Sequence, residues 1–377
     1  AKDRKGAGKY NIHSINVELC THVIYSFAGI KSSGKIKLLD DASDLPEFTS
    51  FIKKHKGVKA LLSIGGSSEG SKKFSTVVSD SSVRNKFVKN VVAFLEKYHF
   101  DGVDIDWEYP ARKGGRKSDK HNYVLLLKEL KQAFAGKGLS LSAAVSAEAS
   151  SASKSYIIKQ VAEYLDFINI MTYDFNGSWN DYTGMNSPLY HSSKDDKDQK
   201  ELNIVRVYSL SYACSRIIDR IQLAGSATEK KSSGPGKAAP YTNEAGTIGY
   251  NEMCVNIREG GWHVVRDKEQ HVPYAYKGDQ WVGYDDVTSI REKAEYVRSM
   301  DLGGVMIWSI DTDDFNGNCG PKNALLSTIN EVLRKCTTHS PFNLAVLFGF
   351  IKRKINLFNI QIYINNKIIC GRHAFTM

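Results

Sequence analysis

The sequence DGVDIDWEYP at residues 101–110 places acidic side chains at three alternating positions, Asp104, Asp106 and Glu108. Alternate side chains of a β-strand share one face, so this pattern predicts a strand with three carboxylates on one side. Their α-carbons would be about 7 Å apart at each step of two residues. Like charges this close cannot all ionise freely, so we expect the pKa of at least one carboxyl group to be raised toward use as an acid.

The intervening residues Val103, Ile105 and Trp107 are apolar, which suits a strand covered by helices. A solvated acidic strand would not explain this apolar face. A hard-metal site on the same three carboxylates stays open as an alternative, because carboxylate oxygens suit magnesium or calcium.

Apolar runs alternate with amphipathic stretches along the chain of 377 residues. This βα alternation predicts a parallel sheet and, at this length, an α/β fold of the barrel type. We expect strands at 21–30, 59–66, 101–109, 139–147, 167–175 and 303–311, and helices at 82–98, 119–136 and 288–300.

Residues 101–108 also fill the pattern DxxDxDxE, and here the sequence resembles glycoside hydrolase family 18, the chitinases and chitinase-like lectins. Four further blocks resemble strands of that family in the same order, at 19–29, 61–66, 171–179 and 303–311. The resemblance covers roughly residues 17–205 and 245–336. It implies an α/β fold in which residues 1–336 form a catalytic (β/α)8 TIM barrel with an α+β insertion domain, at about 241–286, before the last strand.

The resemblance also implies a role for each acidic residue. Glu108 would be the general acid and then the base, and Asp106 would orient the N-acetyl group of the substrate, which family 18 uses as the nucleophile. Asp104 would hold a shared proton behind Asp106, and Tyr173 would donate to the acetamido oxygen. Further residues match positions that shape the sugar subsites, and they are Phe27, Gly65, Gly66, Tyr109, Met171, Asp174, Tyr250 and Trp308.

The activity implied is that of a chitinase, which hydrolyses β-1,4-N-acetylglucosamine linkages in chitin or chitooligosaccharides with retention and without a metal or other cofactor. Two alternatives remain: a chitin-binding lectin, and an inactive truncated or mis-spliced isoform. Lectin members of the family typically lose the signature glutamate, so the presence of Glu108 favours the enzyme. N-acetylglucosaminidases would share the strand and differ in loops.

The net charge of +10 does not by itself indicate nucleic-acid binding. Five of the basic residues lie in 337–377, which contain no Asp or Glu, and no nucleic-acid-binding motif accompanies the charge. This tail has no family resemblance, and its apolar run at 342–351 is too short to span a bilayer. It reads as a non-native extension or an amphipathic membrane-touching tail. We expect a monomer.

The six cysteines show neither CxxC spacing nor clustering, which argues against zinc and a disulfide-framework miniprotein. The family resemblance pairs Cys254 with Cys319 and implies a secreted protein; buried free thiols are the alternative. The opening residues 1–5 are polar, so no signal peptide is expected in this chain.

Three departures from the family pattern are visible. Only residues 1–18 precede the block that resembles the second strand, which leaves open a barrel incomplete at its first strand. Ser67 stands where the family has a tryptophan that stacks on sugar. The segment 206–223 lacks the expected GxPxYGRxF strand.

We expect a loop at 226–240, which is rich in Ser, Gly, Lys and Pro. The insertion that follows is rich in aromatic residues, and we expect most of their rings to form its own core.

Overall fold

The computed structural model describes residues 2–4, 6–38, 43–208, 221–223, 234–236, 238–242 and 245–334. The chain divides into two compact units, Ala1–Leu333 and Arg334–Met377. The first unit contains every element below. The predicted tail at 337–377 and most of the segments at 206–223 and 226–240 lie outside the described residues.

The central layer is a six-stranded sheet in the order β2-β1-β3-β4-β5-β6. All neighbours pair in parallel except β2, which is antiparallel to β1. Five predicted strands are therefore confirmed, with somewhat shorter bounds. The strands are β1 (His22–Ile30), β2 (Ile36–Leu38), β3 (Lys59–Gly65), β4 (Gly102–Asp106), β5 (Ser140–Ser146) and β6 (Phe167–Met171).

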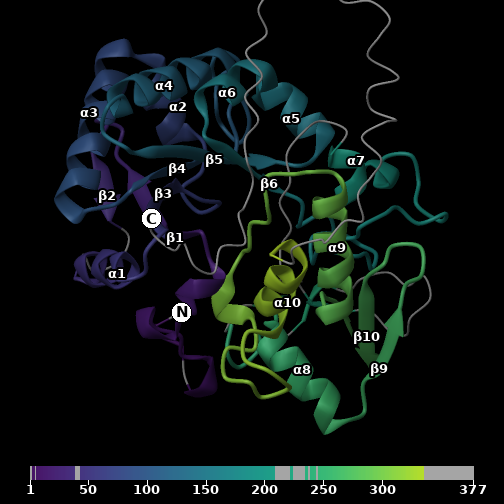
Figure 1. Ribbon diagram of the computed structural model, residues 1–377. Helices are drawn as coiled ribbons and strands as arrows, with labels where there is room; N and C mark the ends of the chain where they lie inside the picture. Colours follow the sequence, from purple (N-terminus) through teal and green to yellow (C-terminus); the bar gives the residue numbers. More distant parts are fainter. Residues whose placement is uncertain are drawn as a thin grey trace, which may run out of the picture. The chain divides into compact units, whose positions relative to one another are not determined.

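Helices cover the outer face of this sheet, as Figure 1 shows for α2, α3 and α4. Helix α3 begins after Asp80, whose side chain accepts a hydrogen bond from the Val83 amide, and it ends at His99 in the left-handed conformation. The apolar residues of β4 pack with these helices in one large core. The helices are α1 (Asp44–Lys53), α2 (Lys72–Ser79), α3 (Ser81–Tyr98), α4 (Asp119–Phe134), α5 (Ala149–Ser155) and α6 (Ile158–Tyr164).

The insertion forms a second, entirely antiparallel sheet in the order β8-β7-β11-β10-β9, together with helix α8 (Tyr250–Glu259). The α+β character of the insertion is confirmed, but its sheet starts earlier than residue 241, and β8 falls within the predicted loop. Trp281 and Tyr284 are buried in its small cores. The strands are β7 (Ile221–Leu223), β8 (Gly234–Pro235), β9 (His263–Arg266), β10 (Pro273–Lys277) and β11 (Gln280–Gly283).

The predicted strand at 303–311 is wrong. Residues 303–309 have no regular structure, and Ile310–Thr312 form the short helix η5. The apolar run reads as a strand, but a strand also needs a neighbour with which to exchange hydrogen bonds. The predicted helix at 288–300 is confirmed as α9 (Val287–Ser299), which packs against α10 (Ala324–Leu333).

The barrel is not closed within the part of the chain that the structure describes. Before β1, the described residues form three short 3-10 helices, η1 (Gly6–Gly8), η2 (Ile12–Ser14) and η3 (Val17–Leu19). Beyond β6 lie η4 (Gln199–Glu201) and α7 (Ile204–Tyr208). In the described ranges, no helix has the length and apolar character needed to cross a bilayer.

Candidate active site

Strand β4 divides its side chains as the alternating pattern predicts. Val103, Ile105 and Trp107 join the large core between sheet and helices, which leaves Asp104 and Asp106 on the opposite face. The strand ends at Asp106, however, not at residue 109 as predicted. Glu108 therefore lies two residues beyond the strand and is half-buried.

Asp104 is held by three hydrogen-bond donors, which come from the adjacent strands β3 and β5 and from β6. Its Oδ1 accepts from Ser142 Oγ at 2.6 Å and from Asn169 Nδ2 at 3.1 Å, while its Oδ2 accepts from Ser63 Oγ at 3.0 Å. Burial nevertheless raises the pKa of Asp104, although all three hydrogen bonds act to lower it. No local sequence pattern identifies these three donors, because they come from strands far apart in the chain.

Asp106 is buried as deeply as Asp104, but its Oδ1 has no hydrogen-bond partner. Burial raises the pKa of Asp106 well above its ordinary value, and the charges of Glu108 and Asp104 raise it further. The prediction of a raised pKa in this row is therefore confirmed. Crowding of charges was the expected cause, whereas desolvation is the larger one.

Tyrosine rings surround the carboxylates. Burial raises the pKa of Tyr109, and the charges of Glu108, Tyr156, Asp106 and Tyr173 act in the same direction. The predicted site residues Tyr109 and Tyr173 therefore lie close enough for the charge of one to affect the pKa of the other. Tyr156 is also coupled to Asp106 and Glu108, and its hydroxyl accepts a hydrogen bond from the Ser146 amide at 3.2 Å. Sequence analysis missed Tyr156, which belongs to none of the blocks that resemble the family.

Phe27 and Trp308 meet although 281 positions separate them. Their rings stack with centroids 5.0 Å apart and planes 27° apart. A Cβ atom at Gly66 would lie 2.8 Å from the Phe27 ring, and one at Gly65 would lie 1.9 Å from the Asp106 carbonyl oxygen. Both glycines also have positive φ angles. Only glycine fits at these two positions, which connect the aromatic pair to the carboxylate strand.

Met171 ends β6 and is buried beside Ser146 of β5, and Asp174 follows three residues later. Asp174 has a φ of 57° and is held by Asn186, whose side-chain amide donates to Asp174 Oδ1 at 3.1 Å. Asn186 Oδ1 in turn accepts from the Asp174 backbone amide at 3.3 Å. Asn186 is a second residue that the sequence analysis did not single out.

Tyr250 begins helix α8 and packs against the apolar residues of the insertion and of α9 and α10. Burial raises the pKa of Tyr250 to about 12, and the acidic residues Asp286, Asp313 and Asp314 contribute. These contacts give Tyr250 a role in packing. Its contact with a sugar stays a prediction.

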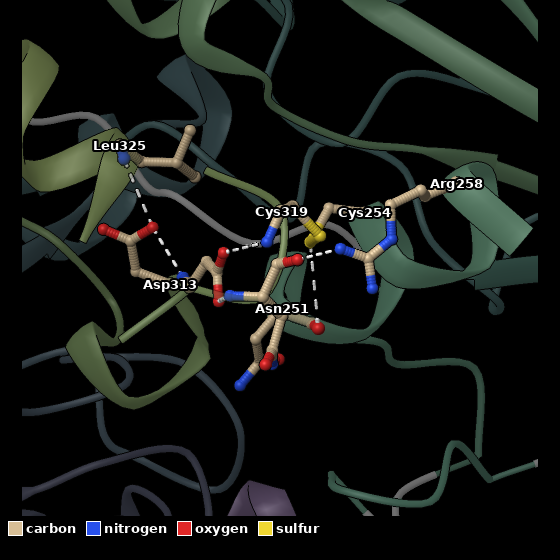
Figure 2. The surroundings of a disulfide bond; sticks show 8 residues. Asn251, Cys254, Arg258, Asp313, Cys319 and Leu325 are labelled. Atoms are coloured by element: carbon tan, nitrogen blue, oxygen red, sulfur yellow. Dashed lines mark hydrogen bonds between the residues drawn. A yellow bond between two sulfur atoms is a disulfide. The ribbon is translucent and has the colours of Figure 1, made fainter. Parts of the chain in front are cut away.

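The predicted disulfide is present in the structure. Cys254 of α8 and Cys319 are joined, with their α-carbons 6.0 Å apart (Figure 2). Asp314 lies beside them and accepts from the Cys319 amide at 2.7 Å. These three residues form the only group with the spacing of a metal site in the described ranges. Because both sulfurs are bonded to each other, they are not thiolate ligands.

This parallel α/β sheet carries a row of carboxyl groups at and just beyond the end of an inner strand, and such groups can give and take protons. The profile of glycosyl hydrolases family 18 matches residues 3–313. The chain therefore belongs to glycosyl hydrolases family 18, as its motifs indicated.

Relatives within the family support this membership. The chain is 36% identical to the Endochitinase of Manduca sexta over 370 residues, which cover 90% of this chain and 66% of that protein. It thus spans slightly less than two thirds of this relative. It is also 36% identical to human Chitinase-3-like protein 2, over 85% of this chain and 87% of that protein.

Solved structures of a chitinase and of a pseudo-chitinase are both similar to this fold. The Group IV chitinase of Ostrinia furnacalis, solved in complex with allosamidin, is 37% identical with a TM-score of 0.85, over 88% of this chain and 96% of that one. Human YKL-39, described as a pseudo-chitinase with retained chitooligosaccharide binding, is 35% identical with a TM-score of 0.82, over 89% and 97%.

Proposed function

We propose that this protein is a chitinase that hydrolyses β-1,4-N-acetylglucosamine linkages by a substrate-assisted, retaining mechanism. The observation that carries the proposal is the row of carboxyl groups along and just beyond β4, where a fixed Asp104, a desolvated Asp106 and a half-buried Glu108 follow one another. Similarity to chitinases over most of the chain supports it.

Glu108 takes the role of general acid and base. Its carboxyl proton goes to the glycosidic oxygen as the bond from that oxygen to the anomeric carbon breaks. The carbonyl oxygen of the substrate's own N-acetyl group forms the new bond to this carbon, which gives an oxazolinium ion. Water then attacks the same carbon and gives its proton to the Glu108 carboxylate, as the bond from this carbon to the N-acetyl oxygen breaks. Two inversions at one carbon produce net retention.

Asp106 orients the N-acetyl group and stabilises the positive charge of the oxazolinium ion. The free Oδ1 of Asp106 is an acceptor that the amide N–H of the substrate can use. Burial and the crowding of carboxyl groups favour a proton on Asp106 in the resting enzyme. Asp104 stays in place behind Asp106 and takes over this shared proton when Asp106 turns to the substrate, which leaves Asp106 negatively charged beside the oxazolinium ion.

The remaining site residues bind the sugars. Tyr173 donates to the acetamido oxygen, and the stacked pair of Trp308 and Phe27 gives the sugar at the cleavage point an aromatic surface. Gly65, Gly66, Tyr109, Met171 and Asp174 shape the adjacent subsites, and Tyr250 contributes from the insertion. No step in this mechanism uses a metal or another cofactor.

A chitin-binding lectin is the second candidate, because the chain is as similar to the pseudo-chitinase YKL-39 as to several chitinases. Glu108 favours the enzyme, since it supplies the proton that a lectin does not need. The disulfide between Cys254 and Cys319 favours an oxidising, extracellular setting for either function. Chitooligosaccharides are the proposed partner, and a monomer is the proposed state.

The test compares the whole chain with its Glu108→Gln variant on a fluorogenic chitotrioside, with chitooligosaccharide binding measured by calorimetry. The amide keeps the shape of the side chain but has no proton to give. We expect kcat to fall by about 10²–10⁴-fold with binding nearly unchanged. Binding without turnover in the unmodified chain would establish the lectin, and loss of both in the variant would contradict the role of Glu108.

A further inference from the structure

Ser71 precedes helix α2 and is 1% exposed. A serine at this position usually accepts a hydrogen bond from an amide in the first turn of the helix. The Ser71 side chain makes no such capping bond. Its hydroxyl points instead to the segment that carries Glu108.

The direction of the two hydrogen bonds follows from the chemistry of the partners. Trp107 Nε1 lies 2.7 Å from Ser71 Oγ, and Ser71 Oγ lies 2.8 Å from the Tyr109 carbonyl oxygen. An indole N–H can only donate, so the Ser71 oxygen accepts from Trp107. Its single proton is then left for the Tyr109 carbonyl. One hydroxyl thus binds the residues on both sides of Glu108.

The Trp107 side of this bridge is rigid. The indole stacks on Phe74 with centroids 5.2 Å apart and planes 13° apart, and Tyr123 meets it edge-on at 5.7 Å. Trp107 is 1% exposed and lies in the close-packed core. Ser71 therefore connects the Tyr109 carbonyl to a side chain that has little freedom to move.

Glu108 needs such support because the sheet does not provide it. The pairing of β4 with β3 ends at Asp106, and its pairing with β5 ends at Ile105. A general acid must stand within a fraction of an ångström of the atom it protonates. We propose that Ser71 is a positioning residue for Glu108, an inference that rests on the hydrolytic function proposed above.

The test uses Ser71→Ala, with a matched control in helix α2, which Ser71 precedes. Ser75 is 2% exposed and bonds to Asp119 Oδ1 at 2.9 Å instead of to residues 107–109. We expect Ser71→Ala to lower kcat on the fluorogenic chitotrioside by about tenfold or more, with KM changed less than about twofold. Ser71→Thr, which keeps the hydroxyl, should recover much of kcat. Ser75→Ala should leave kcat within about twofold of the unmodified chain, although it also loses a buried hydrogen bond.

Equal losses of kcat in Ser71→Ala and Ser75→Ala, or no loss in Ser71→Ala, would overturn the proposal. Hydrogen exchange of the peptide spanning residues 107–112 tests the positioning of Glu108 by Ser71 and needs no measurement of turnover. It should be faster in Ser71→Ala than in Ser75→Ala, and equal exchange in the two variants would overturn the proposal. Absence of turnover in the unmodified chain would refute the hydrolytic function, and the exchange result would still decide the placement.

Discussion

The middle of strand β4 surrounds Asp104 with three hydrogen-bond donors, whereas the carboxyl end of the same strand leaves Asp106 Oδ1 buried without one. The two side chains lie on one face, two residues apart. Buried carboxyl groups without partners are rare in native proteins because each costs free energy. The difference supports the roles proposed above, in which Asp104 stays fixed and Asp106 changes its partner when substrate binds.

The largest effect is expected on turnover when the end of the strand is changed. Asp106→Asn keeps the size of the side chain but removes the negative charge that would stabilise the oxazolinium ion. We expect kcat on the chitotrioside to fall by about 10²–10³-fold, with oligomer binding retained. A kcat within tenfold of the unmodified chain would mean that Asp106 has no part in the chemical step.

The next effect concerns stability and the middle of the strand. Asp104→Ala removes the acceptor of Ser63, Ser142 and Asn169, and we expect the free energy of unfolding to fall by about 2–4 kcal/mol. Asp104→Asn is the matched control, because its amide oxygen can still accept and the Ser63 hydroxyl can turn to accept from its NH₂ group. Urea unfolding at neutral pH measures both. Equal losses in the two variants would show that the three hydrogen bonds add no stability.

The pH dependence of stability is a further test of the difference between Asp106 and Asp104. The folded pKa of Asp106 is raised, so the folded protein binds this proton more tightly than the unfolded chain does. Stability from this group is therefore fully present below the unfolded pKa and is lost as pH rises toward the folded pKa. Asp106→Asn cannot lose a proton, and it should raise Tm at pH 7 by roughly 2 °C or more relative to the unmodified chain. The gain should vanish near pH 3, and a gain independent of pH would contradict the raised pKa.

The smallest effect is expected when Asp104 loses one donor of three. Ser142→Ala should lower the free energy of unfolding by about 1 kcal/mol. It should also raise the pKa of Asp104 further, because the Ser142 hydrogen bond lowers it. Carboxyl titration by NMR would detect the change, with Ser75→Ala as a buried serine control that does not contact Asp104. An unchanged Asp104 pKa would mean that Ser142 does not interact with the charged form.

Local sequence pattern predicted the parts of the fold that depend on local periodicity. The alternation at 103–107 identified the two faces of β4. The family resemblance named Asp104, Asp106, Glu108, Tyr109 and Tyr173, which lie close enough in the fold to affect one another's pKa. The resemblance also supplied the disulfide between Cys254 and Cys319. Neither the alternation nor the spacing would have paired these cysteines.

The rest could not be predicted because it depends on contacts between distant segments. The apolar run at 303–311 has strand composition, yet it forms no strand within the described residues. Ser71, Tyr156 and Asn186 are common polar or aromatic residues whose roles appear only when the fold places them against the site. Whether a carboxylate is solvated, hydrogen-bonded or buried without a partner likewise depends on the residues that the fold places around it.

The central claim is that Glu108 cleaves the linkage with the help of the N-acetyl group of the substrate. Proton NMR of chitotetraose during hydrolysis tests this claim directly, because retention and inversion at the anomeric carbon give different first anomers. The unmodified chain is compared with Glu108→Gln. We predict the β-anomer as first product of the unmodified chain and almost no product from the variant. The α-anomer as first product, or equal turnover by the two proteins, would contradict the account.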